Sequence, residues 1–249
     1  MKTPLFTIDP NLEIVDAIKA GHLVLIDKPL NWTSFQVVNK IRVLFKYKLG
    51  IKKLKVGHAG TLDPLATGLL VICIGRKTKE IEGFIGQNKV YTGTFTLGAT
   101  RPSFDMETEI DKKYQTEDIT EEKIHEVAAA FLGEQLQTPP IFSAKKIDGK
   151  RAYLSAREGK EIKMKQNLIT IYEFKIIKID GNIIHFYISS SKGTYIRSIA
   201  NDFGKKLNSG AYLSSLRRTQ SGDFNIENSI SVEEFEEELV KLADASKSE

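Results

Sequence analysis

The stretch GHAGTLDPLATGLL, at positions 57–70, places one carboxylate between a turn that contains glycines and an apolar run. Its glycines suit a backbone that bends sharply or approaches another group closely. Pro64 fixes its own φ angle and biases Asp63 toward an extended conformation. The run Leu69–Ile74, LLVICI, is typical of a buried strand. The sequence therefore predicts a tight acidic loop that enters a buried strand.

Asp63 and His58 each have two interpretations from the residues alone. An acid on a turn beside a buried strand, with a histidine nearby, fits a reactive group. An aspartate that bonds its own backbone to shape the turn is the more common arrangement. A lone histidine is likewise more often structural. Chemistry alone leaves both interpretations open.

The composition is that of an ordinary globular protein with a mildly basic balance. A length of 249 residues is enough to bury a sizeable core. Lysine and arginine exceed the acids by 36 to 32, which permits nucleic acid binding without requiring it. The single cysteine, Cys73, excludes an internal disulfide framework and a cysteine-rich metal site. No segment is typical of a signal peptide or a membrane span, so we expect a cytoplasmic protein without membrane contact.

The order of residues in 57–70 resembles the catalytic segment of the TruB family of tRNA pseudouridine synthases. The resemblance implies that Asp63 is the catalytic carboxylate and that His58 contributes to substrate binding. Other segments resemble further motifs of that family, in the family's order, from about Gly21 to Thr219. Agreement of several separate motifs makes a chance match a poor explanation.

The segment KPLNWTS, at 28–34, resembles the family's first motif, K-P-x-G-x-(S/T)-S. Asn31 stands where that motif usually has glycine, which puts the shape of the turn in question. Lys28 is either a solvated loop lysine, the commoner case, or a basic residue at the mouth of a substrate site. Thr33 or Ser34 is a good N-cap for the helix predicted to follow.

Positions 40–55 hold a basic run interleaved with aromatic residues: Lys40, Arg42, Phe45, Lys46, Tyr47, Lys48, Lys52, Lys53 and Lys55. One interpretation is a solvated helix face and loop, which is common for such runs. The other is a patch that contacts phosphates beside the acidic loop. The position of the run directly before His58 favours the second.

The segment Lys89–Leu97 alternates with a period of two and predicts a strand. It resembles the family's K-x-Y motif, which implies that Tyr91 stacks on the target base and acts in proton transfer. A tyrosine at the start of a strand is otherwise usually a core residue. Gly98–Thr108 resembles a family loop beside the RNA site, with Asp105 as its acid and Thr108 in place of the usual glycine. From the residues alone, Asp105 equally fits a turn or a cap.

Positions 137–159 resemble a mobile loop and helix with which the family grips an RNA stem-loop. We expect its basic residues to neutralise phosphates, with Lys146 as a substrate-binding residue. The alternative is a solvated basic loop. The residues concerned are Lys145, Lys146, Lys150, Arg151 and Arg157.

The segment SKGTYIRS, at 191–198, resembles another family motif and predicts a helix with Thr194 as its N-cap. An arginine in the first turn of a helix is electrostatically unfavourable, so Arg197 is expected to have a partner carboxylate. The resemblance implies that this partner is Asp63 and that Tyr195 packs beside the base. Without the resemblance, Arg197 is interpreted as a surface residue.

The segment GAYLSSLRRT, at 210–219, resembles the last family motif. The resemblance implies that Leu216 closes the apolar side of the base pocket; otherwise Leu216 is an ordinary core leucine. The twin arginines, Arg217 and Arg218, fit the end of a strand that faces RNA.

The resemblance implies an α+β pseudouridine synthase fold: a central, mostly antiparallel mixed sheet flanked by helices and loops, with the site in a basic cleft. Periodicity predicts strands at 169–179 and 183–190 joined by a hairpin, and helices that begin after Thr120 and Ser231. We expect one catalytic domain over residues 1–249, with its motifs in 21–219. Positions 220–249 are then a short helical extension, and no PUA domain follows.

The resemblance further implies isomerisation of uridine to pseudouridine at position 55 in the T-arm of tRNA. The base is expected to flip into a pocket, where Asp63 initiates cleavage of the glycosidic bond and reattachment through carbon. We expect no metal or other cofactor, no obligatory protein partner and a monomer. The alternatives are a non-catalytic RNA-binding module, for which Asp63 is dispensable, and a synthase that works with guide RNAs. A nucleotide-dependent enzyme lacks support, because no GxxxxGK[ST] motif occurs.

Overall fold

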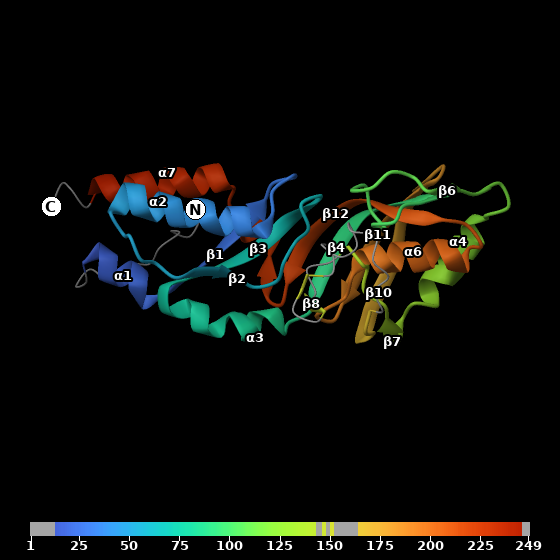
Figure 1. The fold of residues 1–249 in the computed structure, drawn as a ribbon, viewed down its shortest axis with the longest axis horizontal. Coiled ribbons are helices and arrows are strands. Elements are labelled where there is room, and N and C mark those ends of the chain that lie inside the picture. The colour runs from blue at the N-terminus through green and yellow to red at the C-terminus, as the bar shows by residue number, and fades with distance from the viewer. Residues whose placement is uncertain (1–12, 143–145, 148–149, 152–163, 246–249) are drawn as a thin grey trace. The chain divides into compact units, whose positions relative to one another are not determined.

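The computed structural model describes residues 13–142, 146–147, 150–151 and 164–245, with the backbone alone described at 146–147 and 150–151. The chain divides into two compact units. Unit 1 comprises Met1–Gln87 and Arg217–Glu249, and unit 2 comprises Asn88–Leu216. Figure 1 labels their helices and strands. In the part of the chain that is described, no helix is both long and apolar enough to cross a bilayer.

Unit 1 is built on a short antiparallel sheet. Strand β3 pairs with β1 and with β2, and it neighbours β12, which begins in unit 2 and ends in unit 1; β12 in turn pairs with β13. The strands are β1 (His22–Lys28), β2 (Val56–His58), β3 (Ala66–Ile74), β12 (Ala211–Ser221) and β13 (Phe224–Asn225). The helices are α1 (Ile14–Ala20), α2 (Ser34–Leu49), η1 (Gly75–Glu80), α3 (Ile81–Ile85), η2 (Ile226–Asn228) and α7 (Val232–Ala245).

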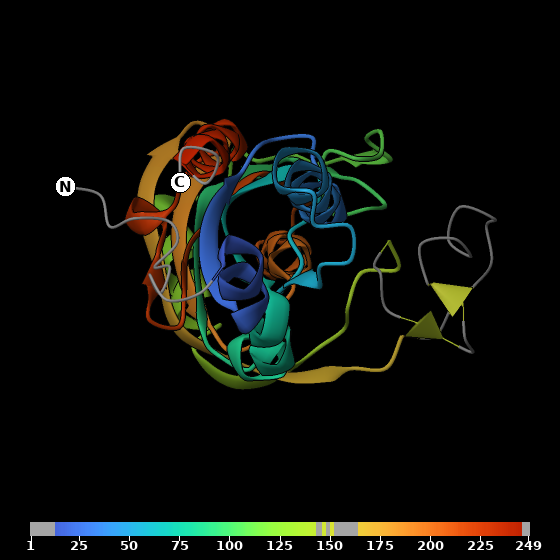
Figure 2. The same cartoon turned by 90° about the vertical axis from the view of Figure 1, so that its left-hand side faces the viewer.

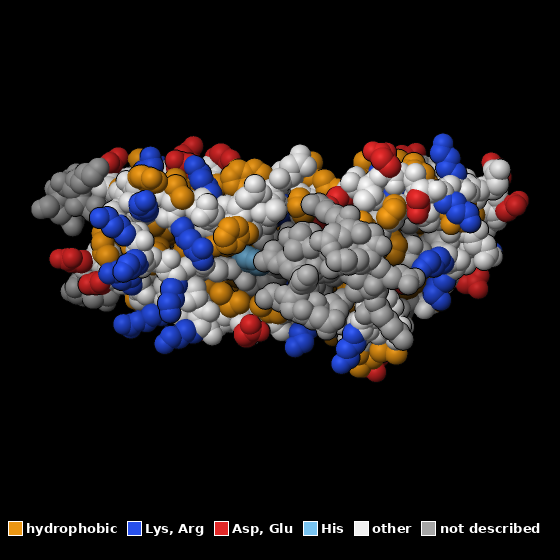
Figure 3. Space-filling model, in the orientation of Figure 1, with side chains coloured by type: hydrophobic (Ala, Val, Ile, Leu, Met, Phe, Trp, Pro, Cys, Tyr) orange, Lys and Arg blue, Asp and Glu red, His pale blue; other side chains and the backbone are white. Residues whose placement is uncertain are grey.

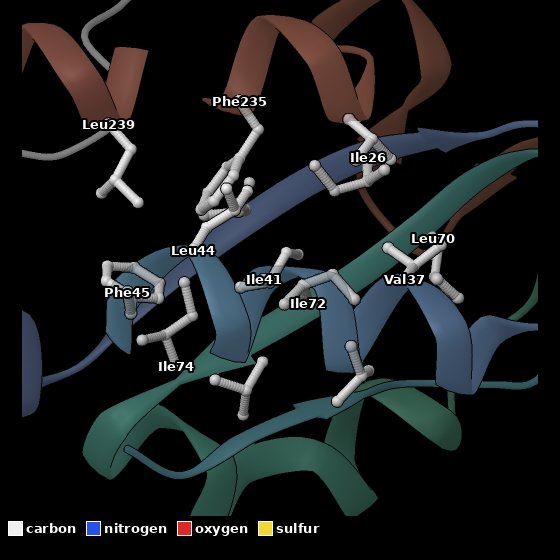
Figure 4. Packing of buried hydrophobic residues seen from close by; sticks show 14 of the residues in the cluster. Ile26, Val37, Ile41, Leu44, Phe45, Leu70, Ile72, Ile74, Phe235 and Leu239 are labelled. Carbon is white, nitrogen blue, oxygen red and sulfur yellow. The ribbon is translucent and has the colours of Figure 1, made fainter. Parts of the chain in front are cut away.

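Strand β3 is buried on both faces, as its uninterrupted apolar run predicts. Leu70, Ile72 and Ile74 join the core that α2 and α7 cover, whereas Leu69 and Val71 belong to a second cluster on the opposite face. Figure 4 shows side chains of α2, α7 and the two strands β1 and β3 converging in the first of these cores. The acidic loop therefore leads into the most buried strand of unit 1.

The ends of the unit 1 helices follow from local chemistry. Thr33 and Gln36 form a capping box at the start of α2, and Gly50, with φ 68°, ends the helix in the left-handed conformation. Ser231 caps α7 by accepting a hydrogen bond from the N–H of Glu234 at 3.0 Å. Helix α1 lies beside η1, as Figures 1 and 2 show.

Unit 2 is an antiparallel sheet covered by helices. Its strands follow the order β12-β4-β11-β10-β7. Beyond β12 these are β4 (Lys89–Leu97), β7 (Gly133–Gln137), β10 (Asn167–Asp180) and β11 (Ile183–Ser190), with two small ribbons, β5 (Ala99–Thr100) with β6 (Lys112–Lys113), and β8 (Lys146–Ile147) with β9 (Lys150–Arg151). The helices are α4 (Glu121–Ala129) and α6 (Ile196–Lys206).

Phenylalanine rings hold α6 and α4 against the unit 2 sheet. Phe95 of β4 contacts Phe186 of β11 with ring centroids 4.3 Å apart, and Phe203 of α6 contacts Phe174 of β10 at 5.7 Å. Phe131, just after α4, completes the cluster. Because aromatic rings bury large areas, this cluster fixes the position of α6 on the sheet.

The α+β class predicted from the sequence is confirmed, and so are most of the predicted elements. The hairpin between β10 and β11 turns at Gly181, with φ 56°. Thr120 caps α4, as its position before the predicted helix indicates, by accepting from the N–H of Lys123. Helix α4 ends at Ala129. The single-domain interpretation and the basic cleft stay predictions.

Candidate active site

Asp63 lies in the loop between β2 and β3, and several hydrogen bonds hold this loop. The hydroxyl of Ser34, at the start of α2, accepts from the N–H of Leu62 at 2.9 Å and donates to its carbonyl at 3.1 Å. On the other side of Asp63, the carbonyl of Pro64 accepts from the N–H of Asn31 at 2.8 Å. The half-buried Asp63 is therefore bracketed by two anchored neighbours.

The turn that carries Asn31 keeps the left-handed conformation that glycine favours. Asn31 has φ 66°, a region in which asparagine is one of the few other residues tolerated. The departure from the motif at this position thus preserves a left-handed turn. The role of Ser34 could not be seen from the sequence, because its partner is far along the chain.

Arg218, on β12, is a second anchor of the acidic loop. Its side chain is only 1% exposed, its Nε donates to the carbonyl of Leu69 at 2.8 Å and its Nη2 donates to the carbonyl of Gly60 at 3.1 Å. At Gly68, with φ 102°, a Cβ would collide with the main-chain oxygen of Arg218. The glycine permits close approach of the two segments.

The expectation that the twin arginines face RNA is wrong for Arg218, which points into unit 1. A signal for this was present, since consecutive residues of a strand point to opposite faces and one of two adjacent arginines must turn inward. Arg217 binds Asp27 instead, with its two guanidinium nitrogens 3.1 and 2.6 Å from the carboxylate oxygens. This bidentate pair ties β12 to the end of β1.

Lys28 ends β1 and is fully buried, which excludes the solvated loop lysine. Its ammonium donates to the carbonyls of Pro29 at 2.9 Å and Trp32 at 2.6 Å. Burial lowers the pKa of Lys28 to about 8, the Asp63 carboxylate opposes the shift and Arg218 adds to it. Lys28 is thus a cation within electrostatic reach of Asp63. Its direct contact with substrate stays a prediction.

His58 ends β2, just before the acidic loop, and is half-buried. Burial lowers its pKa, and the nearby Arg218 lowers it further, while a backbone hydrogen bond to Gly60 opposes the shift. The imidazole is therefore uncharged at neutral pH. An uncharged ring suits contact with a base better than contact with a phosphate.

Arg197, in the first turn of α6, has the partner carboxylate that helix electrostatics demands, and it is not a surface residue. Its Nη1 lies 3.5 Å from Asp105 Oδ2, and the two side chains are 4% and 7% exposed. The same nitrogen donates to the carbonyl of Phe142 at 2.9 Å and approaches that of Ser103 at 3.4 Å. Asp105 therefore helps to hold Arg197 within unit 2.

The predicted N-cap of α6 is wrong by one residue. Tyr195 is the N-cap, without a side-chain cap, because the Thr194 hydroxyl donates to the carbonyl of Ser191 at 2.9 Å. Gln137, buried at the end of β7, binds the main chain of Tyr195 twice: its Oε1 accepts from the N–H at 2.8 Å and its Nε2 donates to the carbonyl at 3.1 Å. This amide clamp, absent from the sequence prediction, sets where the helix begins.

The loop that carries Asp105 is closed by hydroxyl groups. Thr108, which replaces the family's glycine, places its Oγ1 2.9 Å from the Ser103 hydroxyl, and it accepts from the N–H of Ser103 at 3.1 Å. The N–H of Leu213 on β12 donates to the carbonyl of Phe104 at 2.9 Å. Asp105 is therefore on a braced turn, with its carboxylate also accepting from a backbone N–H.

The other predicted site residues of unit 2 lie on separate elements. Tyr91 is buried near the start of β4, and Leu216 is half-buried on β12. Lys146 lies on β8, where the backbone alone is described, as it is for Lys150 and Arg151. Lys145 and Arg157 fall outside the described residues.

The predicted residues thus form two groups. Unit 1 brings Lys28 and His58 to the loop of Asp63, and unit 2 joins Arg197 to Asp105 next to Tyr195. The pairing of Asp63 with Arg197 links the two units and stays a prediction. Among the described residues, no group of three or more histidine, cysteine or acidic side chains is placed to hold a metal ion.

Comparison with solved structures identifies the fold. A chain in a crystal structure of a Cbf5-Nop10-Gar1 complex matches with a TM-score of 0.69 and 25% identity. The match covers 98% of this chain and 65% of that one, so the chain spans slightly under two thirds of its length. The fold is that of the pseudouridine synthases, which convert uridine in RNA to pseudouridine.

Two family models cover most of the chain. The TruB family pseudouridylate synthase N-terminal domain matches residues 46–196, and the tRNA pseudouridylate synthase B C-terminal domain matches residues 197–249. Proteins named tRNA pseudouridine synthase B from Flavobacterium johnsoniae and Phocaeicola vulgatus are 56% and 52% identical, over 88% and 89% of this chain and 96% and 94% of their own. The chain belongs to the TruB family and is a pseudouridine synthase.

Proposed function

We propose that the chain isomerises a uridine in the T-arm of tRNA, at position 55, with Asp63 as the catalytic carboxylate. The relatives named tRNA pseudouridine synthase B support the RNA class. The assignment of Asp63 as the catalytic residue is supported by the way the acidic loop is held. Ser34 and Arg218 hold it by its main chain, at Leu62 and Gly60, and these bonds fix where the loop presents the carboxylate.

The reaction breaks the C1′–N1 bond, turns the uracil and forms a C1′–C5 bond, after which the proton on C5 leaves. Asp63 acts in its charged form, as a nucleophile or as a base. A carboxylate beside the Lys28 ammonium is favoured in that form. Arg197 supplies a second cation when it pairs with Asp63, and its bonds to Phe142 and Asp105 keep the guanidinium oriented.

The target uridine leaves the RNA stack to reach the carboxylate, which costs a few kcal/mol. Aromatic and apolar side chains offset that cost by stacking on the extruded base. Tyr91, Tyr195 and Leu216 have this role in the proposal, and Tyr91 also takes part in proton transfer. His58, uncharged at neutral pH, contacts the loop from which the base has left. Lys28, Asp105 and Lys146 complete the substrate-binding set.

In the proposed function, one catalytic domain acts alone, as a monomer in the cytoplasm and without a cofactor. A solved neighbour is a complex with two other proteins, Nop10 and Gar1, so independence of partners needs its own test. The purified chain by itself, treated with a chelator, is expected to have full activity.

Incubation of the chain with an isolated T-arm stem-loop, followed by mapping of pseudouridine, tests the function. The expected result is one pseudouridine at position 55, and none when that uridine is replaced by cytidine. The unmodified stem-loop must also remain unconverted without protein. Modification only at another site, or only in the presence of a guide RNA, would contradict the proposal.

A further inference from the structure

The basic run at 40–55 is divided by ion pairing with α7. Lys40 lies 2.7 Å from Glu236 and Lys48 lies 3.9 Å from the same carboxylate. These two lysines share the single negative charge of Glu236 on the surface where α2 packs against α7. They are therefore not free to bind an external anion at full strength.

The later part of the run lines a concavity of about 410 Å³ at the end of α2 and in the loop that follows. Its walls are Arg42, Ile51, Lys52, Lys53, Leu54 and Lys55. The three lysines are exposed, and the described residues include no carboxylate paired with them. Figure 3 shows Lys and Arg side chains gathered on this part of unit 1.

Arg42 fixes the shape of this basic concavity. Its Nη2 donates to the carbonyl of Val56 at 2.5 Å, which ties the helix to the first residue of β2. Ile51, which also lines the concavity, is buried. The charged groups are therefore carried by a segment that is packed against the rest of unit 1.

The concavity lies at the opposite end of β3 from Asp63. Val56 pairs with Ile74, the last residue of β3, whereas Asp63 precedes Ala66, the first. A strand rises about 3.3 Å per residue, so the two ends of β3 are about 25 Å apart. An RNA whose target nucleotide is at Asp63 must extend well beyond that nucleotide to reach the concavity.

We propose that the concavity formed by Arg42, Lys52, Lys53 and Lys55 is a binding site for the phosphate backbone of the RNA substrate, about 25 Å from the reacting uridine. The inference rests on the proposed function. Lysine ammonium groups act as point charges that suit phosphates in any sequence. The site therefore adds affinity for a whole tRNA and takes no part in the reaction of a short stem-loop.

The test compares two variants with the same loss of charge. The first is the triple variant Lys52→Gln, Lys53→Gln, Lys55→Gln. The control is Lys40→Gln, Lys48→Gln, Lys241→Gln, which removes three lysines that are already paired with Glu236 or Glu238. Binding and turnover are measured with whole tRNA and with the T-arm stem-loop, over a range of salt concentrations.

For the first variant, the Kd for whole tRNA is expected to rise about 10- to 100-fold at low salt, and its salt dependence to flatten by about two to three charges. Turnover of the stem-loop is expected to stay within about twofold of the parent. The control is expected to change the Kd for whole tRNA by less than about threefold.

If the first variant binds whole tRNA as tightly as the parent, the inference is wrong. The concavity would then bind another partner, such as an acidic protein. An equal loss with the control variant, or an equal loss on the stem-loop, would also overturn it. The proposed function is judged separately, by whether the parent converts the stem-loop at all.

Discussion

At the scale of single residues, two buried cations define the surroundings of Asp63. Arg218 donates hydrogen bonds to the carbonyls of Leu69 and Gly60, so it acts on the loop and not on substrate. Lys28 is held by two carbonyls of its own turn and is close enough to Asp63 to feel its charge. Arg218 therefore acts on the position of the acidic loop, and Lys28 acts on its electrostatics.

Arg218→Met is expected to lower the free energy of unfolding by about 2–4 kcal/mol, because two buried carbonyls lose their donor. Arg218→Lys keeps the charge but cannot reach both carbonyls, so turnover is expected to fall about tenfold or more with RNA affinity unchanged. Urea unfolding and stem-loop kinetics measure the two effects. The neighbouring change Arg217→Met, which removes a half-exposed ion pair, should cost less than about 1 kcal/mol. Equal effects of the two arginines would refute the positioning role.

The pKa of Lys28 predicts a basic limb in the pH profile of turnover. With a pKa of about 8, the side chain is about nine-tenths protonated at pH 7 and mostly neutral at pH 9. The cation next to the acidic loop is thus lost as the pH rises, and turnover is expected to fall with an apparent pKa near 8. In Lys28→Arg, which stays charged, the rate that remains should be flat from pH 7 to 9. If turnover of the Lys28→Arg variant still falls between pH 7 and 9, a group other than Lys28 causes the fall.

At the scale of elements, the start of α6 determines where Tyr195 and Arg197 lie. The helix begins where the amide of Gln137 binds both main-chain groups of Tyr195, and its first turn is tied to the segment after β7 through Phe142 and Thr138. The clamp is formed by residues 58 positions apart in the chain. The clamp therefore fixes the start of α6 relative to β7, the edge strand of the unit 2 sheet.

Gln137→Met, which keeps the size of the side chain but removes both hydrogen bonds, is expected to lower stability by about 2–3 kcal/mol. Because Tyr195 and Arg197 shift together, kcat should fall at least tenfold with little change in KM. Thermal melting and steady-state kinetics on the stem-loop measure these effects. Gln166→Met, at an exposed glutamine with one weak hydrogen bond, is the control and should resemble the parent. A change in KM alone would contradict the positioning role.

Elements whose cause is local were predictable from the sequence. The capping residues before α4 and α7, the hairpin at Gly181 and the doubly buried β3 all follow from short patterns. The first residue of α6 and the inward turn of Arg218 depend on partners far along the chain. Local patterns cannot contain such partners, although strand alternation places the side chains of two adjacent arginines on opposite faces of a sheet. The acidic loop was predicted from its glycines, Pro64 and the apolar run that follows, whereas its anchors were found only in the structure.

At the scale of the whole molecule, the chain passes from unit 1 to unit 2 and back. Unit 1 carries Asp63, Lys28 and His58, whereas unit 2 carries Arg197, Tyr195 and Tyr91. Strand β12 belongs to both, with Leu216 in one unit and Arg217 in the other. The proposed chemistry therefore requires both units, and neither carries the complete set of residues.

The most direct test of the account is single-turnover formation of pseudouridine by Asp63→Asn, with RNA binding measured in parallel. Asparagine has nearly the same shape but no charge, so the loop and its anchors should persist. The account predicts that turnover falls by about 10⁴-fold or more while the Kd for the stem-loop stays within about threefold. Turnover within tenfold of the parent, or a loss of binding as large as the loss of turnover, would contradict it.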